Sequence, residues 1–301
     1  MARQVTITYF HHSGFSAQVG NTLMIFDYWR GEDDFFPADA HLQEKELQAY
    51  DDVFFFVSHD HPDHYDEVIF SYKHLNNVHY IVDSGVDTSE NVERMCCGDK
   101  RTFGDLTVTA YDSTDRGISF YVEIAGVRIF HAGDLNLWHW REENSLRNIT
   151  EAEERYYAAV QPLIGLPMDV AMFPLDPRMG AMYEAGANHF IMTCKPHVFI
   201  PMHWQGRNEI AAEFAGKCKT KFTEGLALTK PRERAVIGFE RRALNIHVYT
   251  EMDHENVRKR KQRSEGDDLM HALRALEDND PFAESDLPVD NITGNSQNEN
   301  A

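Results

Sequence analysis

An apolar run that ends in a dense cluster of ionisable side chains constrains the fold of this chain more than any other feature. Residues 53–57 read Val-Phe-Phe-Phe-Val, and a continuous run of this length is typical of a strand that is buried on both faces. After Ser58, three histidines and two aspartates occur within six residues, in the order His59-Asp60-His61-Pro62-Asp63-His64. The fold must therefore bury the strand and still present its end as a polar site.

The residue types and spacing in this cluster suit divalent metal ions. Neutral imidazole nitrogens and carboxylate oxygens are the ligands that Zn²⁺, Mn²⁺ and Fe²⁺ prefer. His59 and His61 are two residues apart, so they project to the same side of an extended segment. Pro62 bends the chain, which allows Asp63 and His64 to turn toward a neighbouring point. One segment can therefore supply two ligands to each of two cations.

Hydrophobic periodicity predicts alternating strands and helices up to about residue 250. Thr150 and Glu153 form a candidate capping box for the third helix. Two sets of strands interleaved with helices favour sheets that pack together with helices outside. We expect strands at residues 5–10, 15–19, 23–26, 53–57, 79–82, 106–111, 118–124, 127–131, 170–173, 198–200 and 243–250, and helices at residues 42–48, 66–74, 150–164, 180–187 and 208–217.

The C-terminal part of the chain has a different composition. We expect residues 1–250 to form the folded domain, residues 251–278 a charged and partly helical extension, and residues 279–301 a disordered acidic tail. The basic run at residues 258–263 is predicted to be a solvated helix face rather than a nucleic-acid patch.

The net charge and the cysteines limit which partners and which cellular compartment we expect for this chain. A formal charge of −20 repels phosphate backbones and anionic lipid, so we expect neither nucleic acid nor membrane as a partner. There is no apolar stretch of about 18 residues and no signal-peptide pattern. The four cysteines show no CxxC spacing, which favours reduced thiols in a cytoplasmic protein. The expected partner is a small-molecule substrate. The sequence does not decide whether the chain also forms a homo-oligomer.

The central segment resembles the signature of the metallo-β-lactamase superfamily. Three further positions match that family in order and spacing: Asp27 after the strand at 23–26, Asp134 in His131-Ala132-Gly133-Asp134, and His203 in Ile200-Pro201-Met202-His203. The resemblance covers about residues 5–205 and implies an α/β (α+β) fold, a four-layer αββα sandwich. It implies that Asp134 bridges two divalent cations and that Asp27 orients a ligand histidine. The implied metal ligands are His59, His61, Asp63, His64, Asp134 and His203.

One position departs from the family pattern. The family usually has a further histidine ligand between the central motif and the bridging aspartate. His74 falls on an expected helix and His79 begins a strand, while His131 is expected to support the site from behind. We predict that Asp115 fills the position, with Asp112 as the next choice. The alternative is that Asp115 is only a turn residue. An oxygen ligand there would favour Mn²⁺ or Fe²⁺ over Zn²⁺.

The resemblance is greatest to the branch that includes ascorbate-6-phosphate lactonase, and the opening Tyr9-Phe10-His11-His12-Ser13-Gly14-Phe15 supports it. It implies a binuclear hydrolase in which a hydroxide shared by two metals attacks a lactone, ester or phosphodiester of a small anionic molecule. Asp27, Asp63 and Asp134 would be its catalytic residues. The alternatives are a mono-iron or di-iron oxidoreductase on the same scaffold and a non-catalytic metal-binding protein.

Four further residues are predicted to contact the substrate. His12 would lie at the rim of the site, or else cap a turn. Trp138 and His139 follow the bridging aspartate closely and would form a pocket wall, unless they are core. Arg178 could clamp a carboxylate or phosphate, or else form a structural ion pair.

Overall fold

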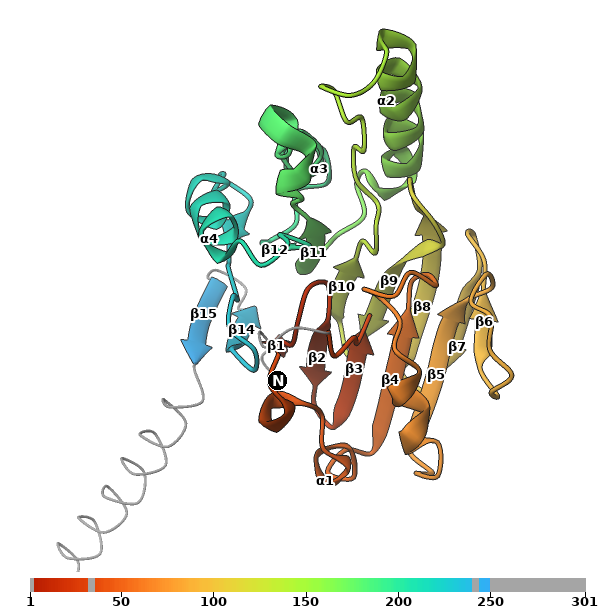
Figure 1. Ribbon diagram of the computed structural model, residues 1–301. Coiled ribbons are helices and arrows are strands. Elements are labelled where there is room, and N and C mark those ends of the chain that lie inside the picture. The colour runs from red at the N-terminus through yellow and green to blue at the C-terminus, as the bar shows by residue number, and fades with distance from the viewer. Residues whose placement is uncertain (1–2, 32–35, 240–243, 250–301) are drawn as a thin grey trace, which may run out of the picture. The chain divides into compact units, whose positions relative to one another are not determined.

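The computed structural model describes residues 3–31, 36–239 and 244–249. The extension predicted at 251–278 and the tail predicted at 279–301 lie outside these residues, as does the basic run. Within the described part, the strands form two sheets (Figure 1). No helix in that part combines the length and the apolar character that a membrane span requires.

The first sheet has the strand order β15-β14-β1-β2-β3-β4-β5-β6. The strands from β3 to β6 run parallel, and the others pair antiparallel with their neighbours. Its strands are β1 (Arg3–Tyr9), β2 (Phe15–Val19), β3 (Thr22–Phe26), β4 (Asp52–Val57), β5 (Val78–Asp83), β6 (Glu93–Met95), β14 (Arg234–Phe239) and β15 (Leu244–Tyr249).

The second sheet has the order β13-β12-β11-β10-β9-β8-β7. The strands from β10 to β13 run parallel, while β7 to β10 pair antiparallel in succession. Its strands are β7 (Lys100–Phe103), β8 (Leu106–Asp112), β9 (Ile118–Ile124), β10 (Val127–His131), β11 (Val170–Pro174), β12 (Val198–Met202) and β13 (Glu224–Gly225).

Strand β4 shows why its sequence is apolar at every position. Phe54 and Phe56 belong to the core between the two sheets, where the rings of Phe56 and Phe120 of β9 lie 5.1 Å apart. Phe55 points to the opposite face and joins a second core with Ile69. Because successive side chains of a strand alternate between faces, an apolar residue is needed at each position when both faces are covered.

Helices cover the outer face of each sheet. Leu47 and Phe70 join the second core, which places α1 and η2 on the outer face of the first sheet. On the second sheet, the ring of Phe190 in α3 stacks 4.6 Å from that of Phe173 in β11, and Figure 1 shows α2, α3 and α4 beyond this sheet. These layers confirm the predicted αββα sandwich. The α-helices are α1 (Glu44–Leu47), α2 (Leu146–Val160), α3 (Ala185–Cys194) and α4 (Asn208–Lys217), and the 3₁₀ helices are η1 (Ala38–Ala40), η2 (Glu67–Tyr72), η3 (Gln161–Leu163) and η4 (Pro177–Met182).

Two predictions about helices were wrong. Helix α2 begins four residues before Thr150, and its N-cap is Ser145, whose side chain accepts a hydrogen bond from the backbone of Asn148. The hydroxyl of Thr150 instead donates to the carbonyl of Leu146 within the helix. The helix predicted at 180–187 is divided between η4, which ends at Met182, and α3, which begins at Ala185. Gly180 has a positive φ of 66°, so a regular helix cannot begin there.

Candidate metal centre

Every residue of the candidate centre follows the end of a strand. Asp27 follows β3, the segment 58–64 follows β4, Asp134 lies after β10 and His203 follows β12. Strands β3 and β4 are parallel in one sheet, and β10, β11 and β12 are parallel in the other. The carboxyl ends of each set therefore meet at one edge of their sheet, and the two edges face one another across the centre.

A first cluster consists of His59, His61, Asp115 and Asp134. Each residue offers one ligand atom, and these atoms all lie within 4.8 Å of one another. The Nδ1 atom of His61 is 3.4 Å from Oδ2 of Asp115, and Nε2 of His59 is 3.5 Å from Oδ2 of Asp134. Asp115 is thus brought to the place where an oxygen ligand was predicted, whereas Asp112 is an exposed residue outside the cluster.

A second cluster consists of His12, Asp63, His64 and His203, again with ligand atoms within 4.8 Å of one another. The Nε2 atom of His12 is 3.3 Å from Oδ2 of Asp63. Oδ1 of Asp134 lies 3.1 Å from Nε2 of His64 and 3.4 Å from Nε2 of His203. The two oxygens of Asp134 therefore face the two clusters, which is the position expected of a carboxylate shared by two cations.

The polar atoms in these clusters fit a divalent metal ion. Nε2 of His12, Nε2 of His64 and Oδ1 of Asp134 are buried, and none of them makes a hydrogen bond within the described part of the chain. A buried polar atom without a partner costs free energy, and a cation among these three atoms would remove that cost. Mixed imidazole and carboxylate ligands suit Zn²⁺, Mn²⁺ or Fe²⁺.

The ionisation of the clusters is consistent with cation binding. Burial alone would raise the pKa of Asp134, but His64 and His203 hold it well below its usual range. Burial, together with His203 and His64, lowers the pKa of His12 to about 3, so His12 carries the neutral imidazole that a metal requires. Burial would also lower the pKa of His64, yet Asp134 and Asp27 raise it well above its usual value. A positive charge is therefore favoured between these carboxylates.

Asp27 holds His64 from behind. It is completely buried, and its Oδ2 lies 2.8 Å from Nδ1 of His64. The backbone N–H and the hydroxyl of Ser58 each donate to Asp27 at 2.7 Å. These contacts turn Nε2 of His64 toward the second cluster, which is the usual role of a carboxylate behind a ligand histidine.

His131 connects the segments that carry His12 and Asp134. Its Nε2 lies 2.9 Å from the carbonyl oxygen of Ser13, and its Nδ1 accepts a hydrogen bond from the backbone of Gly133 at 3.2 Å. It does not belong to either cluster. Its position agrees with the expectation that it supports the site from behind.

Two glycines allow the loops to approach one another. A Cβ atom on Gly117 would lie 1.9 Å from the carbonyl oxygen of Ser58, and one on Gly133 would lie 2.8 Å from Cβ of Ser58. Both glycines have positive φ angles, of 65° and 53°. The loops that carry Asp115 and Asp134 can therefore lie directly against the segment 58–64 only because these positions lack a side chain.

Asp176 is a site residue that the sequence analysis did not single out. It is fully buried after β11, and its Oδ2 lies 3.0 Å from Nδ1 of His203. Arg178 donates to the same carboxylate from Nε at 2.9 Å. It therefore forms a structural ion pair, which was one of the two roles predicted for it. Burial would raise the pKa of Asp176, but His203 and Arg178 lower it to about 2. Only its place after a buried strand could have drawn attention to Asp176.

A cavity of about 440 Å³ opens beside both clusters. Trp138 and Trp140 line it with stacked rings whose centroids lie 6.0 Å apart, and Arg178 lines it as well. Two predictions about substrate contacts do not match this arrangement. His139, which lies between the two tryptophans in the sequence, is buried and does not line the cavity. His12 lies within the second cluster instead of at the rim of the site.

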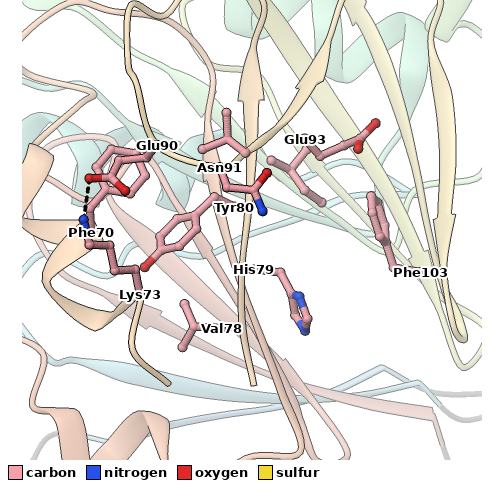
Figure 2. Close-up of a pocket in the computed structure, with 11 residues that line it drawn as sticks. Phe70, Lys73, Val78, His79, Tyr80, Glu90, Asn91, Glu93 and Phe103 are labelled. Carbon is pink, nitrogen blue, oxygen red and sulfur yellow. Dashed lines mark hydrogen bonds and ion pairs between the residues drawn. The ribbon is translucent and has the colours of Figure 1, made fainter. Parts of the chain in front are cut away.

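A second cavity, of about 410 Å³, lies beside β5, where Tyr80 and Asn91 line it and Lys73 pairs with Glu90 at 2.6 Å (Figure 2). Its lining contains a single histidine, His79, and none of the residues of the two clusters. The two clusters of candidate metal ligands therefore border the first cavity and not this one.

Comparisons with known proteins agree with this assignment of the fold. Residues 6–149 match a family described as a beta-lactamase superfamily domain. The structure of Igni18, a metallo hydrolase from Ignicoccus hospitalis, is similar with a TM-score of 0.56 and 18% identity, over 79% of this chain and 100% of the other. YhfI, a metallo-beta-lactamase fold protein from Bacillus subtilis, gives a TM-score of 0.51 with 12% identity, over 79% and 99% of the two chains.

A third similar structure has a different chemistry. A mutant of the CmlA beta-hydroxylase gives a TM-score of 0.51 with 13% identity, over 78% of this chain and 54% of the other; CmlA is a diiron enzyme of Streptomyces venezuelae. No curated protein sequence matches the chain. At these identities the structural likeness establishes the fold and leaves the reaction to be argued from the site.

Proposed function

We propose that the chain is a binuclear metal-dependent hydrolase of the metallo-β-lactamase superfamily. The proposal is supported by the match of residues 6–149 to a beta-lactamase superfamily domain and by the two clusters of histidines and aspartates. The observation that carries the proposal is the position of Asp134, whose two oxygens face different clusters. His59, His61, Asp115 and Asp134 would hold one divalent cation. His12, Asp63, His64 and His203 would hold the other, with Asp134 shared.

The reaction that this arrangement suits is hydrolysis of a lactone, an ester or a phosphodiester in a small molecule. Zn²⁺, Mn²⁺ or Fe²⁺ ions would lower the pKa of a water molecule and polarise the attacked carbonyl or phosphoryl oxygen. The water oxygen bonds to carbon or phosphorus, the C–O or P–O ester bond breaks, and a water proton passes to the departing oxygen. A ring-opened hydroxy acid, or an acid and an alcohol, results.

The protein's own residues orient and transfer protons. Asp27 and Asp176 fix the rings of His64 and His203, so little reorganisation is needed when substrate enters. Asp63 lines the cavity and its side chain is 34% exposed. Its Oδ2 faces His12 and His203, which leaves Oδ1 as the atom that would hold a proton on its way to the leaving oxygen.

Metal analysis combined with a substrate panel tests the proposal. We expect two metal equivalents per chain, hydrolysis of at least one lactone, ester or phosphodiester, and loss of both metal and hydrolysis in Asp134→Asn. Asp105→Asn, at an exposed aspartate outside both clusters, is the matched control. A single bound metal, or an Asp134→Asn variant that keeps both, would contradict a shared carboxylate.

An oxidoreductase is the second candidate, because the first cluster has as many carboxylates as histidines. Mixed sets of histidines and carboxylates with open positions hold iron in non-haem oxygenases, and one similar structure is that of a diiron hydroxylase. Iron content after aerobic purification and oxygen consumption with a reductant separate the two reactions. Iron at two equivalents with oxygen uptake, and no hydrolysis, would favour the oxidoreductase.

A further inference from the structure

The cavity beside the clusters has two cationic side chains although the chain as a whole carries a formal charge of −20. Arg155 and Arg178 both line it. The aspartates that line it are Asp63, Asp115 and Asp134, and all three belong to the clusters. Cations bound in the clusters would neutralise these carboxylates, so the charge presented to an incoming molecule is that of the two guanidinium groups.

Arg178 is anchored on the side of the second cluster. Its Nε and Nη2 atoms donate to the buried carboxylate of Asp176, which also contacts His203. Its Nη1 atom has no hydrogen-bond acceptor among residues 3–31, 36–239 and 244–249. The guanidinium plane is therefore fixed by one edge and keeps free N–H groups at the other.

Arg155 is anchored on the side of the first cluster. It extends from α2, and its Nη2 donates to the carbonyl oxygen of Thr114 at 3.0 Å. Thr114 directly precedes Asp115, so this hydrogen bond ties Arg155 to the loop that carries a candidate metal ligand. No other atom of the Arg155 guanidinium has an acceptor within the part of the chain that the structure describes.

A flat aromatic surface belongs to the same cavity. The rings of Trp138 and Trp140 are inclined by only 15° to one another. The indole N–H of Trp138 donates to the carbonyl oxygen of Asp134 at 2.7 Å, which fixes this ring beside the shared carboxylate. The guanidinium of Arg178 lies 5.9 Å from the ring centre of Trp140. Indole faces bind planar apolar groups favourably.

We propose that the site takes a small organic oxyanion with a flat ring. Its carboxylate or phosphate would lie between Arg155 and Arg178, and its ring would pack on Trp138 and Trp140. Arginine forms paired, charge-assisted hydrogen bonds with both kinds of oxyanion, and a cavity of about 440 Å³ has the size of a small-molecule site. The inference names the substrate class of the proposed hydrolase and therefore rests on that function.

Quenching of tryptophan fluorescence by unreactive probes tests the inference. The probes are para-nitrobenzoate, para-nitrophenylphosphonate and the neutral para-nitrobenzamide, each titrated into protein loaded with Zn²⁺ or Mn²⁺. We expect at least one anion to bind about tenfold tighter than the amide. Arg155→Gln and Arg178→Gln should each remove most of that difference, because each weakens the binding of the anions more than that of the amide. Trp140→Leu should weaken all three probes. The anion that binds more tightly identifies the carboxylate or the phosphate class.

The matched control is Arg147→Gln. Arg147 lies on the same helix, pairs with Glu151 at 2.7 Å and does not line the cavity, so its loss should leave every Kd within about twofold. The inference is overturned if Arg155→Gln behaves like this control, or if the amide binds as tightly as both anions. An anion preference that chelation abolishes but Arg155→Gln does not change would also overturn it, because the metal ions alone would then hold the anion. Since none of the probes contains a lactone, ester or phosphodiester bond, these results stand apart from the search for activity.

Discussion

Two candidate ligand histidines each have a buried carboxylate behind the ring. His64 has Nδ1 at 2.8 Å from Asp27 and Nε2 directed to Asp134. His203 has Nδ1 at 3.0 Å from Asp176 and Nε2 directed to Asp134. A carboxylate at Nδ1 fixes the tautomer that leaves Nε2 free for a metal and makes the ring a stronger ligand. The geometry of the second cluster is therefore set before any cation arrives.

Replacing Asp27 with asparagine tests this support without changing the volume of the side chain. One acceptor oxygen remains where Ser58 and His64 now share two, so we expect metal affinity to fall roughly 10- to 100-fold. Competitive metal titration with a chromophoric chelator measures the change. Asp60→Asn is the control, because Asp60 lies within the same motif but pairs outward with Arg116 at 3.1 Å. Equal affinities of the two variants would show that Asp27 does not orient His64.

Asp115 gives the first cluster its second carboxylate, and its removal should affect one metal only. We expect Asp115→Ala to weaken one of two bound cations roughly tenfold or more, and Asp115→His to restore binding with a shift toward Zn²⁺. Metal stoichiometry after dialysis against buffered Zn²⁺ or Mn²⁺ measures this. Asp112→Ala, at the exposed last residue of β8, should leave both sites intact. If Asp115→Ala keeps the wild-type stoichiometry and affinity, Asp115 is only a turn residue.

Residues of the centre differ in how far the sequence could predict them. His59, His61, Asp63 and His64 lie within six residues of the chain, so their spacing alone indicates a metal site. The role of His12 depends on how the turn after β1 lies against the other sheet, and no local pattern records that. Asp176 is an ordinary aspartate in sequence and becomes a site residue only because β11 and β12 are neighbours.

At the scale of elements, the loops after the strands must pack closely for ligands to converge. Gly117 shows the requirement most clearly, since its φ is 65° and a Cβ would lie 1.9 Å from the carbonyl oxygen of Ser58. Whatever the composition of the loop, this contact fixes the distance between the β8–β9 turn and the end of β4.

The variant Gly117→Ala should destabilise the fold and displace Asp115. A left-handed backbone costs about 1–2 kcal/mol once a Cβ is present, and the steric clash should add about 1–3 kcal/mol. Gly104→Ala is the matched control, because its φ is 57° but no atom lies within 4 Å of the added Cβ. Free energies of unfolding in urea give the difference, and equal losses in the two variants would mean that the contact with Ser58 is not tight.

Element types were easier to predict than element boundaries. Helix α4 coincides with the predicted range 208–217 because its apolar residues Ile210, Ala211 and Phe214 keep the helical spacing. Strands β6 and β7 were not predicted, since they are short, and Lys100–Phe103 has few apolar residues. Their pairing is decided by neighbouring strands, which a single stretch of sequence does not contain.

At the scale of the whole described domain, Asp169 joins both sheets away from the metal centre. It is fully buried. Its carboxylate accepts hydrogen bonds from Arg128 at 2.9 Å and from His197 at 3.2 Å, and it forms an ion pair with Arg3 of β1 at 3.2 Å. Burial alone would raise the pKa of Asp169, but these partners lower it to about 2.

This depressed pKa makes stability depend on pH in a defined direction. The folded protein keeps Asp169 ionised below the usual pKa of 3.8, so its contribution is complete above about pH 4 and is lost as the pH falls through about 2. The contribution at neutral pH is about 2 kcal/mol. We expect Asp169→Asn to lower the free energy of unfolding by that amount at pH 7 and by much less near pH 2. A penalty that does not shrink in acid would exclude this linkage.

Each cluster takes ligands from loops of both sheets. His12 and the 58–64 segment extend from the first sheet, while Asp115, Asp134 and His203 extend from the second. Cations bound in these positions would link the two sheets of the sandwich. Growth of cells without transition metals should therefore shorten the lifetime of the protein as well as remove its activity. Without bound cations the two sheets would separate more often, and the exposed backbone would be cleaved by proteases.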